Sequence, residues 1–206
     1  MSLKIYYDKD WIDNTVKSLL KEAIFYFKSN NRIKYIKYLI EILKNHNICD
    51  HFLDYQKLFF EERLIDAIKM ILCFEYLLKA DLISRGYIVH FYKGWKPGES
   101  NLIKISDLNW IGDDCYFEKF KINEFNTISF SKLLELKESN LPGNIKAIIT
   151  KEYFLRNRLH FSIAGKSHAI EPAEGYELIL IDFLNKELIE KYNSLSDDRE
   201  SIIDYL

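Results

Sequence analysis

Turn-forming residues and cysteines are scarce in this chain of 206 residues, which contains 7 Gly, 3 Pro and 3 Cys. Three cysteines, Cys49, Cys73 and Cys115, provide no disulfide framework and suit a reducing cytoplasm. A chain poor in turn formers and rich in Lys, Leu, Ile and Glu is expected to be mainly α-helical. Apolar residues make up 48% of the chain, enough for a sizeable core.

Long apolar runs and excess positive charge are also missing. No apolar run of the length that a membrane span needs occurs, and residues 1–11 lack the apolar region of a signal peptide, so we expect a cytoplasmic protein without a membrane partner. The formal net charge of -2 argues against a general electrostatic binder of nucleic acids, although a local basic site remains compatible with it.

Metal and cofactor signatures are weak. His46, Cys49, Asp50 and His51 are metal-ligand types, but no second cluster stands at a finger or protease spacing, so a turn is the better interpretation. The stretch "GWKPGES" lacks the spacing of a phosphate loop and is more typical of a surface turn. We therefore expect neither a metal nor a cofactor.

Apolar periodicity predicts a series of helices. Asp10 or Asp13 is expected to cap the first, and Gly86 to end the longest. Ser129 or Ser131 is expected to start a short helix, and Asn144 to cap the one after it. The predicted helices cover 10–29, 33–46, 54–86, 131–139, 145–163 and 176–193.

Residues 87–128 change character, since Gly, Pro, Asn and Asp alternate there with aromatic residues. This pattern predicts an irregular excursion with short strands, and its length hints at an insertion with its own role. Without a clear linker or repeat, 1–206 is interpreted as a single helical domain. It would comprise an N-terminal helical pair at 1–50 and a core at 54–194 that carries the insertion.

The stretch "LRNRLHF" places Arg156 and His160 four residues apart, on one face of a predicted helix, with Asn157 beside them. A guanidinium can grip a phosphate through two hydrogen bonds, and its charge disfavours protonation of a neighbouring imidazole. That imidazole could take the proton of an RNA 2′-hydroxyl without a metal, whereas DNA lacks the hydroxyl. The plain alternative is a solvated face, or an Arg that caps a nearby carboxylate.

Other polar and aromatic residues leave two interpretations open. Glu75 lies in a mostly apolar helix and needs a partner, for which Lys79, Arg156 or His160 could serve, in a structural or a functional role. Lys166 and His168 in "AGKSH" could contact phosphate next to Arg158, or belong to a simple polar loop. Some aromatics could stack on nucleic-acid bases, although core or dimer contacts explain them more simply: Tyr87, Phe91, Tyr92, Trp95 and Trp110.

Two segments, "AIKMILCFEYLLKADLISRGY" (67–87) and "FSKLLELKESNLPGNIKAIITKEYFLRNRLHFSI" (130–163), resemble the HEPN family of all-helical domains. The first has a Glu and a Lys one turn apart, Glu75 and Lys79, and the second ends in the Arg-Asn start of an Arg…His motif. The resemblance covers about half of the chain. It implies an up-and-down helical bundle, usually dimeric, in which Arg156 and His160 would be catalytic, Asn157 would orient them and Glu75 would support them.

Many HEPN proteins are metal-independent endoribonucleases of toxin–antitoxin, phage-defence or RNA-processing systems, and others are inactive binding or assembly modules. The resemblance therefore implies RNA as substrate, a homodimer, and an antitoxin or nucleotidyltransferase as partner. The alternative is a non-catalytic module for a protein or nucleotide. The chain departs from the family in having three residues between Arg and His, where four to six are usual. One residue fewer turns His by about 100° on a regular helix. The site could still form if the helix is locally distorted or if Arg156 and His160 come from different subunits. Alternatively, the site has decayed, or His168 substitutes.

Overall fold

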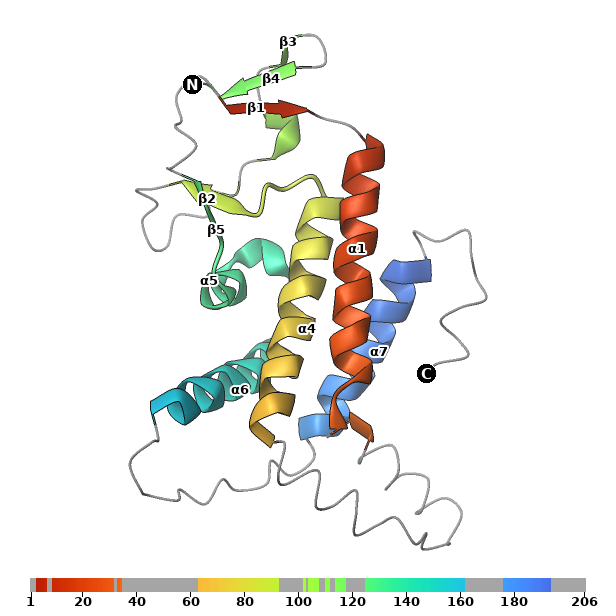
Figure 1. Ribbon diagram of the computed structural model, residues 1–206, viewed down its shortest axis with the longest axis vertical. Coiled ribbons are helices and arrows are strands. Elements are labelled where there is room, and N and C mark those ends of the chain that lie inside the picture. Colours follow the sequence, from red (N-terminus) through yellow and green to blue (C-terminus); the bar gives the residue numbers. More distant parts are fainter. Residues whose placement is uncertain are drawn as a thin grey trace, which may run out of the picture. The chain divides into compact units, whose positions relative to one another are not determined.

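The computed structural model describes residues 3–6, 9–31, 33–34, 63–92, 102, 104–107, 110–111, 114–117, 125–161 and 176–193 (Figure 1). Most of these residues are helical, which confirms the predicted mainly-α class. No helix in this part of the chain is long and apolar enough to cross a membrane. The chain divides into two compact units: unit 1 comprises residues 1–21 and 75–140, and unit 2 comprises 22–74 and 141–206. The single-domain organisation stays a prediction.

Unit 1 has a helical core drawn from three segments. It contains the first part of α1 (Lys9–Lys28), the second part of α4 (Arg63–Ser84) and the short α5 (Phe130–Glu135), followed by the 3-10 helix η3 (Lys137–Ser139). Apolar residues at intervals of three and four in α1 are buried, as an amphipathic helix requires. The buried apolar residues of unit 1 are Ile12, Val16, Leu20, Leu77, Leu78, Ala80, Leu82, Val89, Ile128, Phe130, Leu133, Leu134 and Leu136.

The described residues of unit 1 also include five short strands in two antiparallel sheets. β1 (Leu3–Tyr6), β4 (Asp114–Phe117) and β3 (Trp110–Ile111) form a sheet in the order β1-β4-β3, and β2 (His90–Tyr92) pairs with β5 (Phe125–Thr127). Four of these strands lie within 87–128, together with the 3-10 helix η1 (Ile105–Asp107). The first strand, β1, was not predicted. It pairs with β4, where Phe117 stands opposite Leu3 although more than half of the sequence separates them.

The end of α4 is a glycine-dependent C-terminal cap. Gly86 has a φ of +79°, a backbone region that L side chains rarely adopt. The Gly86 N–H donates to the Ile83 carbonyl and the Tyr87 N–H to the Leu82 carbonyl, each at 2.9 Å. These two bonds make a Schellman motif with glycine in its left-handed position. The prediction that Gly86 ends this helix is therefore confirmed.

Unit 2 contains the end of α1, the first part of α4, α6 (Gly143–Phe161) and α7 (Tyr176–Asn193). α6 contacts α7, and the rings of Phe74 and Phe183 stack at a centroid distance of 6.1 Å between α4 and α7. This core is apolar and nearly continuous through the first part of α4. Its buried residues are Ala23, Phe27, Ile33, Ala67, Met70, Ile71, Cys73, Phe74, Ile145, Ile148, Ile149, Leu180, Ile181, Leu184 and Leu188.

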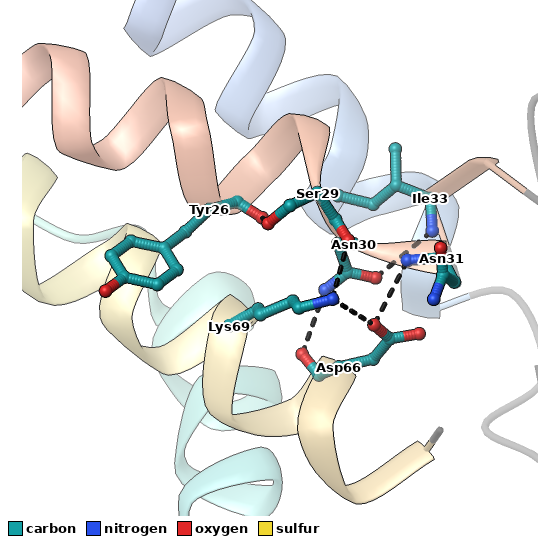
Figure 2. A network of polar contacts seen from close by, with 7 residues as sticks. All are labelled: Tyr26, Ser29, Asn30, Asn31, Ile33, Asp66 and Lys69. Atoms are coloured by element: carbon teal, nitrogen blue, oxygen red, sulfur yellow. Dashed lines mark hydrogen bonds and ion pairs between the residues drawn. The ribbon is translucent and has the colours of Figure 1, made fainter. Parts of the chain in front are cut away.

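A buried polar network joins the end of α1 to the first turns of α4 (Figure 2). The fully buried Asn30 donates from Nδ2 to the Asp66 carbonyl at 2.9 Å and accepts the Ile33 N–H at 3.3 Å. The equally buried Asp66 accepts the Asn31 N–H on Oδ1 at 3.0 Å. Lys69 lies 3.6 Å from that carboxylate and donates to the Ser29 carbonyl at 2.7 Å. Backbone groups that the end of α1 leaves unpaired thus find partners on α4.

Several predicted boundaries shift by a few residues. α6 begins at Gly143, so Asn144 lies inside its first turn and does not cap it. Ser129 precedes α5 as predicted, yet its side chain makes no capping hydrogen bond and instead lies 3.1 Å from the Ser131 hydroxyl. The last predicted helix, 176–193, matches α7 at both ends. Residues 35–46 of the second predicted helix and 54–62 of the third lie outside the described residues.

Candidate functional site

The predicted catalytic residues lie on the last turns of α6. Its backbone is α-helical from Gly143 to Phe161, and the Thr150 hydroxyl donates back to the Lys146 carbonyl at 2.7 Å. Because the helix is unbroken, Arg156 and His160 stand one turn apart, with Cβ atoms about 5–6 Å apart in such a helix. The shortened spacing is therefore not absorbed by a break in the helix. The side chains of residues 155–161, including Asn157 and Arg158, lie outside the description.

The row of positions that holds Arg156 and His160 begins at a buried carboxylate. Glu152 stands four residues before Arg156 and only 7% of it is exposed to solvent. Ile145 and Ile149 continue the same side of α6 and are also buried, whereas Phe154, on another side, is 58% exposed. Positions 152, 156 and 160 thus form a row of acid, guanidinium and imidazole along one helix.

Sequence reasoning missed Glu152, although the spacing that singled out Arg156 and His160 could have revealed it. Extending that spacing one turn toward the N-terminus reaches position 152 directly. A carboxylate one turn before an arginine is the favourable order for an i,i+4 ion pair, and a buried carboxylate requires polar partners. Glu152 has interactions in the structure. Position 156 therefore lies one helical turn after a buried acid.

The predicted supporting pair is found on α4, in unit 1. Lys79 Nζ lies 2.6 Å from Glu75 Oε1, and the two side chains are 13% and 23% exposed. Of the three partners considered for Glu75, the structure supplies Lys79. Glu before Lys at i,i+4 is also the stabilising order on a helix. The Arg…His row belongs to unit 2, so Glu75 and Lys79 are a pair within their own unit.

Lys166 and His168 lie outside the described residues, as do His46, Cys49, Asp50 and His51. In the part of the chain that the structure describes, no three His, Cys, Asp or Glu side chains gather as a metal site would require. Cys73 is fully buried, and this burial raises the pKa of its thiol far above the ordinary range. Such a thiol is a packing group, not a nucleophile.

A second polar group, which sequence reasoning found only in part, lies just after α4. Tyr87 was one of five aromatics predicted to be able to stack on bases. In the structure the Arg85 guanidinium carbon lies 5.5 Å from the Tyr87 ring centroid, and Lys104 Nζ lies 5.1 Å from it. Arg85 and Lys104 are exposed. The side chains of Phe91, Tyr92, Trp95 and Trp110 lie outside the description.

The chain thus carries two candidate groups: the row at 152, 156 and 160 on α6, and the cluster of Arg85, Tyr87 and Lys104. No protein-family model, no curated protein and no solved structure matches this chain. The first group combines an acid, a guanidinium and an imidazole. The second places two cations against one aromatic ring. Proteins use guanidinium groups to hold phosphates and combine cations with aromatic rings to hold single-stranded nucleic acids.

Proposed function

We propose that this protein is a metal-independent endoribonuclease of the HEPN type, acting in the cytoplasm in a toxin or phage-defence setting. The observation that carries the proposal is the unbroken backbone of α6, which holds Arg156 and His160 one turn apart. The HEPN-like order of a long helix bearing Glu75 and Lys79, followed by the helix of the Arg…His motif, adds to it. Fold alone does not determine function, so the proposal rests on these two side chains.

The chemistry follows from the properties of the two groups. His160, neutral beside a guanidinium, takes the proton of a 2′-hydroxyl, and the resulting oxygen attacks the adjacent phosphorus. The bond from phosphorus to the 5′-oxygen breaks, leaving a 2′,3′-cyclic phosphate, while the imidazolium returns its proton to the 5′-oxygen. Arg156 offsets the negative charge that grows on the phosphoryl oxygens. The nucleophile belongs to the RNA itself, so no metal-bound water is required.

Glu152 would position Arg156 in this scheme. A flexible arginine loses rotamer freedom when it grips a phosphate, and a carboxylate one turn away can hold its guanidinium before RNA arrives. Glu152 itself is buried, with only 7% of it exposed to solvent. Asn157 would orient the pair, and Arg158, Lys166 and His168 are proposed as further phosphate contacts.

Assembly and partners follow the HEPN resemblance. We propose a homodimer in which the Arg156 and His160 of two subunits meet in one cleft, with an antitoxin or nucleotidyltransferase as a further partner. Phe154 is 58% exposed on another side of α6 from Arg156 and His160, where it offers apolar surface to a partner. Exposed aromatic side chains are common in protein interfaces.

The test is cleavage of single-stranded RNA by purified protein in EDTA. We expect products ending in 2′,3′-cyclic phosphate, no cleavage of DNA, and loss of cleavage in His160→Ala with an unchanged circular dichroism spectrum. Lys151→Ala is the matched control, since it removes an exposed cation from the same helix outside the row at 152, 156 and 160. Equal cleavage by wild type and His160→Ala would refute the assignment.

One observation favours a second function, a non-catalytic HEPN-like module that binds a protein or nucleotide. The burial of Glu152 allows a purely structural role for Arg156, as its internal counter-ion. This alternative expects Arg156→Ala to lower stability by about 3–5 kcal/mol, the usual result of leaving a buried charge alone. It also expects no RNA cleavage by the wild-type protein. The catalytic proposal expects cleavage that is lost in Arg156→Lys.

A further inference from the structure

Backbone hydrogen bonds join the two segments that carry Arg85, Tyr87 and Lys104. Tyr87 follows the glycine of the α4 cap, and its N–H is bonded to the Leu82 carbonyl. Tyr87 and Lys104 form an antiparallel β-bridge, and the Ile105 N–H donates to the Gly86 carbonyl at 2.8 Å. The three side chains therefore project from a fixed piece of backbone, although 17 residues of sequence separate Tyr87 from Lys104.

Arg85 is held by further bonds that leave part of its guanidinium available. Its Nη2 atom donates to Asp81 Oδ2 and to the Glu138 carbonyl. Within the described residues, Nη1 and Nε have no hydrogen-bond partner. One edge of the guanidinium is thus anchored while its other N–H groups can bind a ligand. Anchoring lowers the conformational entropy lost on binding.

The charges of the cluster do not balance. Asp81 is the carboxylate paired with Arg85, whereas Lys104 has no ion-pair partner in the part of the chain that the structure describes. Each cation is attracted to the ring, but two like charges near one ring repel each other. An anion that touches both cations would relieve this repulsion, and a phosphate group has the oxygens to accept from both.

We propose that Arg85, Tyr87 and Lys104 form a contact site for a phosphate group of single-stranded RNA. Arg85 and Lys104 bind the phosphate oxygens, and the Tyr87 ring holds the two cations and offers a surface to the neighbouring nucleotide. The choice of RNA rests on the function proposed above; the two cations near one ring by themselves favour an anion such as phosphate. The site contributes to binding and takes no part in the bond cleavage.

The experiment measures binding of a fluorescent 2′-O-methyl RNA oligonucleotide to the full chain by anisotropy. Such RNA lacks the free 2′-hydroxyl, so binding is measured apart from cleavage. Lys104→Ala should weaken binding on the order of 3–10-fold and lower the slope of log Kd against log salt by about 0.7, the value for one single-strand phosphate contact. Arg85→Lys should weaken it less, since the charge remains. Tyr87→Leu should weaken binding by at least threefold, because the ring is lost.

Lys132→Ala is the matched control. Lys132 lies in the same unit and its ammonium is 2.9 Å from Glu135, so its charge is already balanced. We expect its affinity to stay within twofold of wild type. Equal affinities of Lys104→Ala and Lys132→Ala, or no RNA binding by wild type, would overturn the inference.

Competition identifies the source of the phosphate. Inorganic phosphate or ATP at millimolar concentration should displace the oligonucleotide poorly. If either displaces it at micromolar concentration in wild type but not in Lys104→Ala, the site takes small phosphates and the RNA assignment is wrong. RNA cleavage together with Lys104-independent binding would overturn this inference while sparing the proposed function. Lys104-dependent binding without cleavage would support this inference and overturn the proposed function.

Discussion

Replacement of Asp66 by alanine should destabilise unit 2 by about 2–4 kcal/mol. Asp66 is fully buried, and its Oδ1 accepts the Asn31 N–H at 3.0 Å while lying 3.6 Å from Lys69 Nζ. A hydrogen bond to a charged acceptor contributes about 1.5–3 kcal/mol, and a buried N–H deprived of its acceptor costs about 1–3 kcal/mol. Lys69 is partly exposed and keeps its bond to the Ser29 carbonyl, so its contribution to the loss is small.

Two milder variants separate the contributions. Asp66→Asn keeps an oxygen for the Asn31 N–H but removes the charge, and should destabilise by about 1–2 kcal/mol. Lys69→Met keeps the apolar stem and removes the ammonium, and should destabilise by about 0.5–1 kcal/mol. Urea unfolding followed by far-ultraviolet circular dichroism, at low and at 0.5 M salt, measures all three free energies of unfolding. The loss in Asp66→Ala should change little with salt, because the bond to the Asn31 N–H is short-ranged.

The ranking of the variants shows whether the network forms in solution and whether the charge of Asp66 or its hydrogen bond to Asn31 stabilises it. If Asp66→Ala lies within 0.5 kcal/mol of wild type, the buried network does not join α1 to α4 in solution. If Asp66→Asn destabilises as much as Asp66→Ala, then the charge, and not the acceptor for Asn31, is what matters. A free energy that changes strongly with salt would point to the same conclusion.

Three further variants test other parts of the fold. Burial raises the pKa of the Cys73 thiol, so the unfolded chain loses this proton near its ordinary pKa while the folded chain keeps it. The contribution of this thiol to the free energy of unfolding is therefore fully present below about pH 8 and falls above it by about 1.4 kcal/mol per pH unit. Unfolding curves at pH 8–10.5 measure this slope, and Cys73→Ala should remove it. Gly86→Ala should lower the free energy of unfolding by about 1 kcal/mol, since alanine is strained at a φ of +79°; an unchanged urea midpoint would contradict the cap. A double-mutant cycle of Glu75→Gln and Lys79→Met should give a coupling of about 0.5–1 kcal/mol that shrinks in 1 M salt, and zero coupling would mean that the pair is absent in solution.

Helix positions could be predicted because they depend on local patterns. Periodic apolar residues placed the last helix at 176–193, as observed. Gly86 marked the end of the longest helix because only glycine adopts that backbone conformation without strain. The prediction that Asn144 caps α6 was wrong because the helix already begins at Gly143. The Pro142 carbonyl accepts the Lys146 N–H, the first bond of this helix.

Pairings between distant segments could not be predicted. The strand that begins at Leu3 pairs with one that ends at Phe117, and nothing in either short segment encodes the other. Lys104 is an ordinary lysine in the sequence, and only the bridge to Tyr87 brings it to the ring that Arg85 also contacts. The row on α6 is the opposite case. Its members lie four residues apart, so Glu152 could have been found from spacing alone, although its burial could not.

The formal net charge of -2 argues against general binding of nucleic acids, but it does not exclude binding by individual exposed cations. Net charge governs long-range attraction to nucleic acids, whereas a cation that touches a phosphate acts through released counter-ions, one contact at a time. Lys104 is exposed with no ion-pair partner among the described residues, and Arg85 keeps unbonded N–H groups beside its one carboxylate. Those two groups would bind few phosphates and give a shallow salt dependence. An acidic chain can therefore bind RNA through a local group of cations, which is the role proposed for Arg85 and Lys104 at Tyr87.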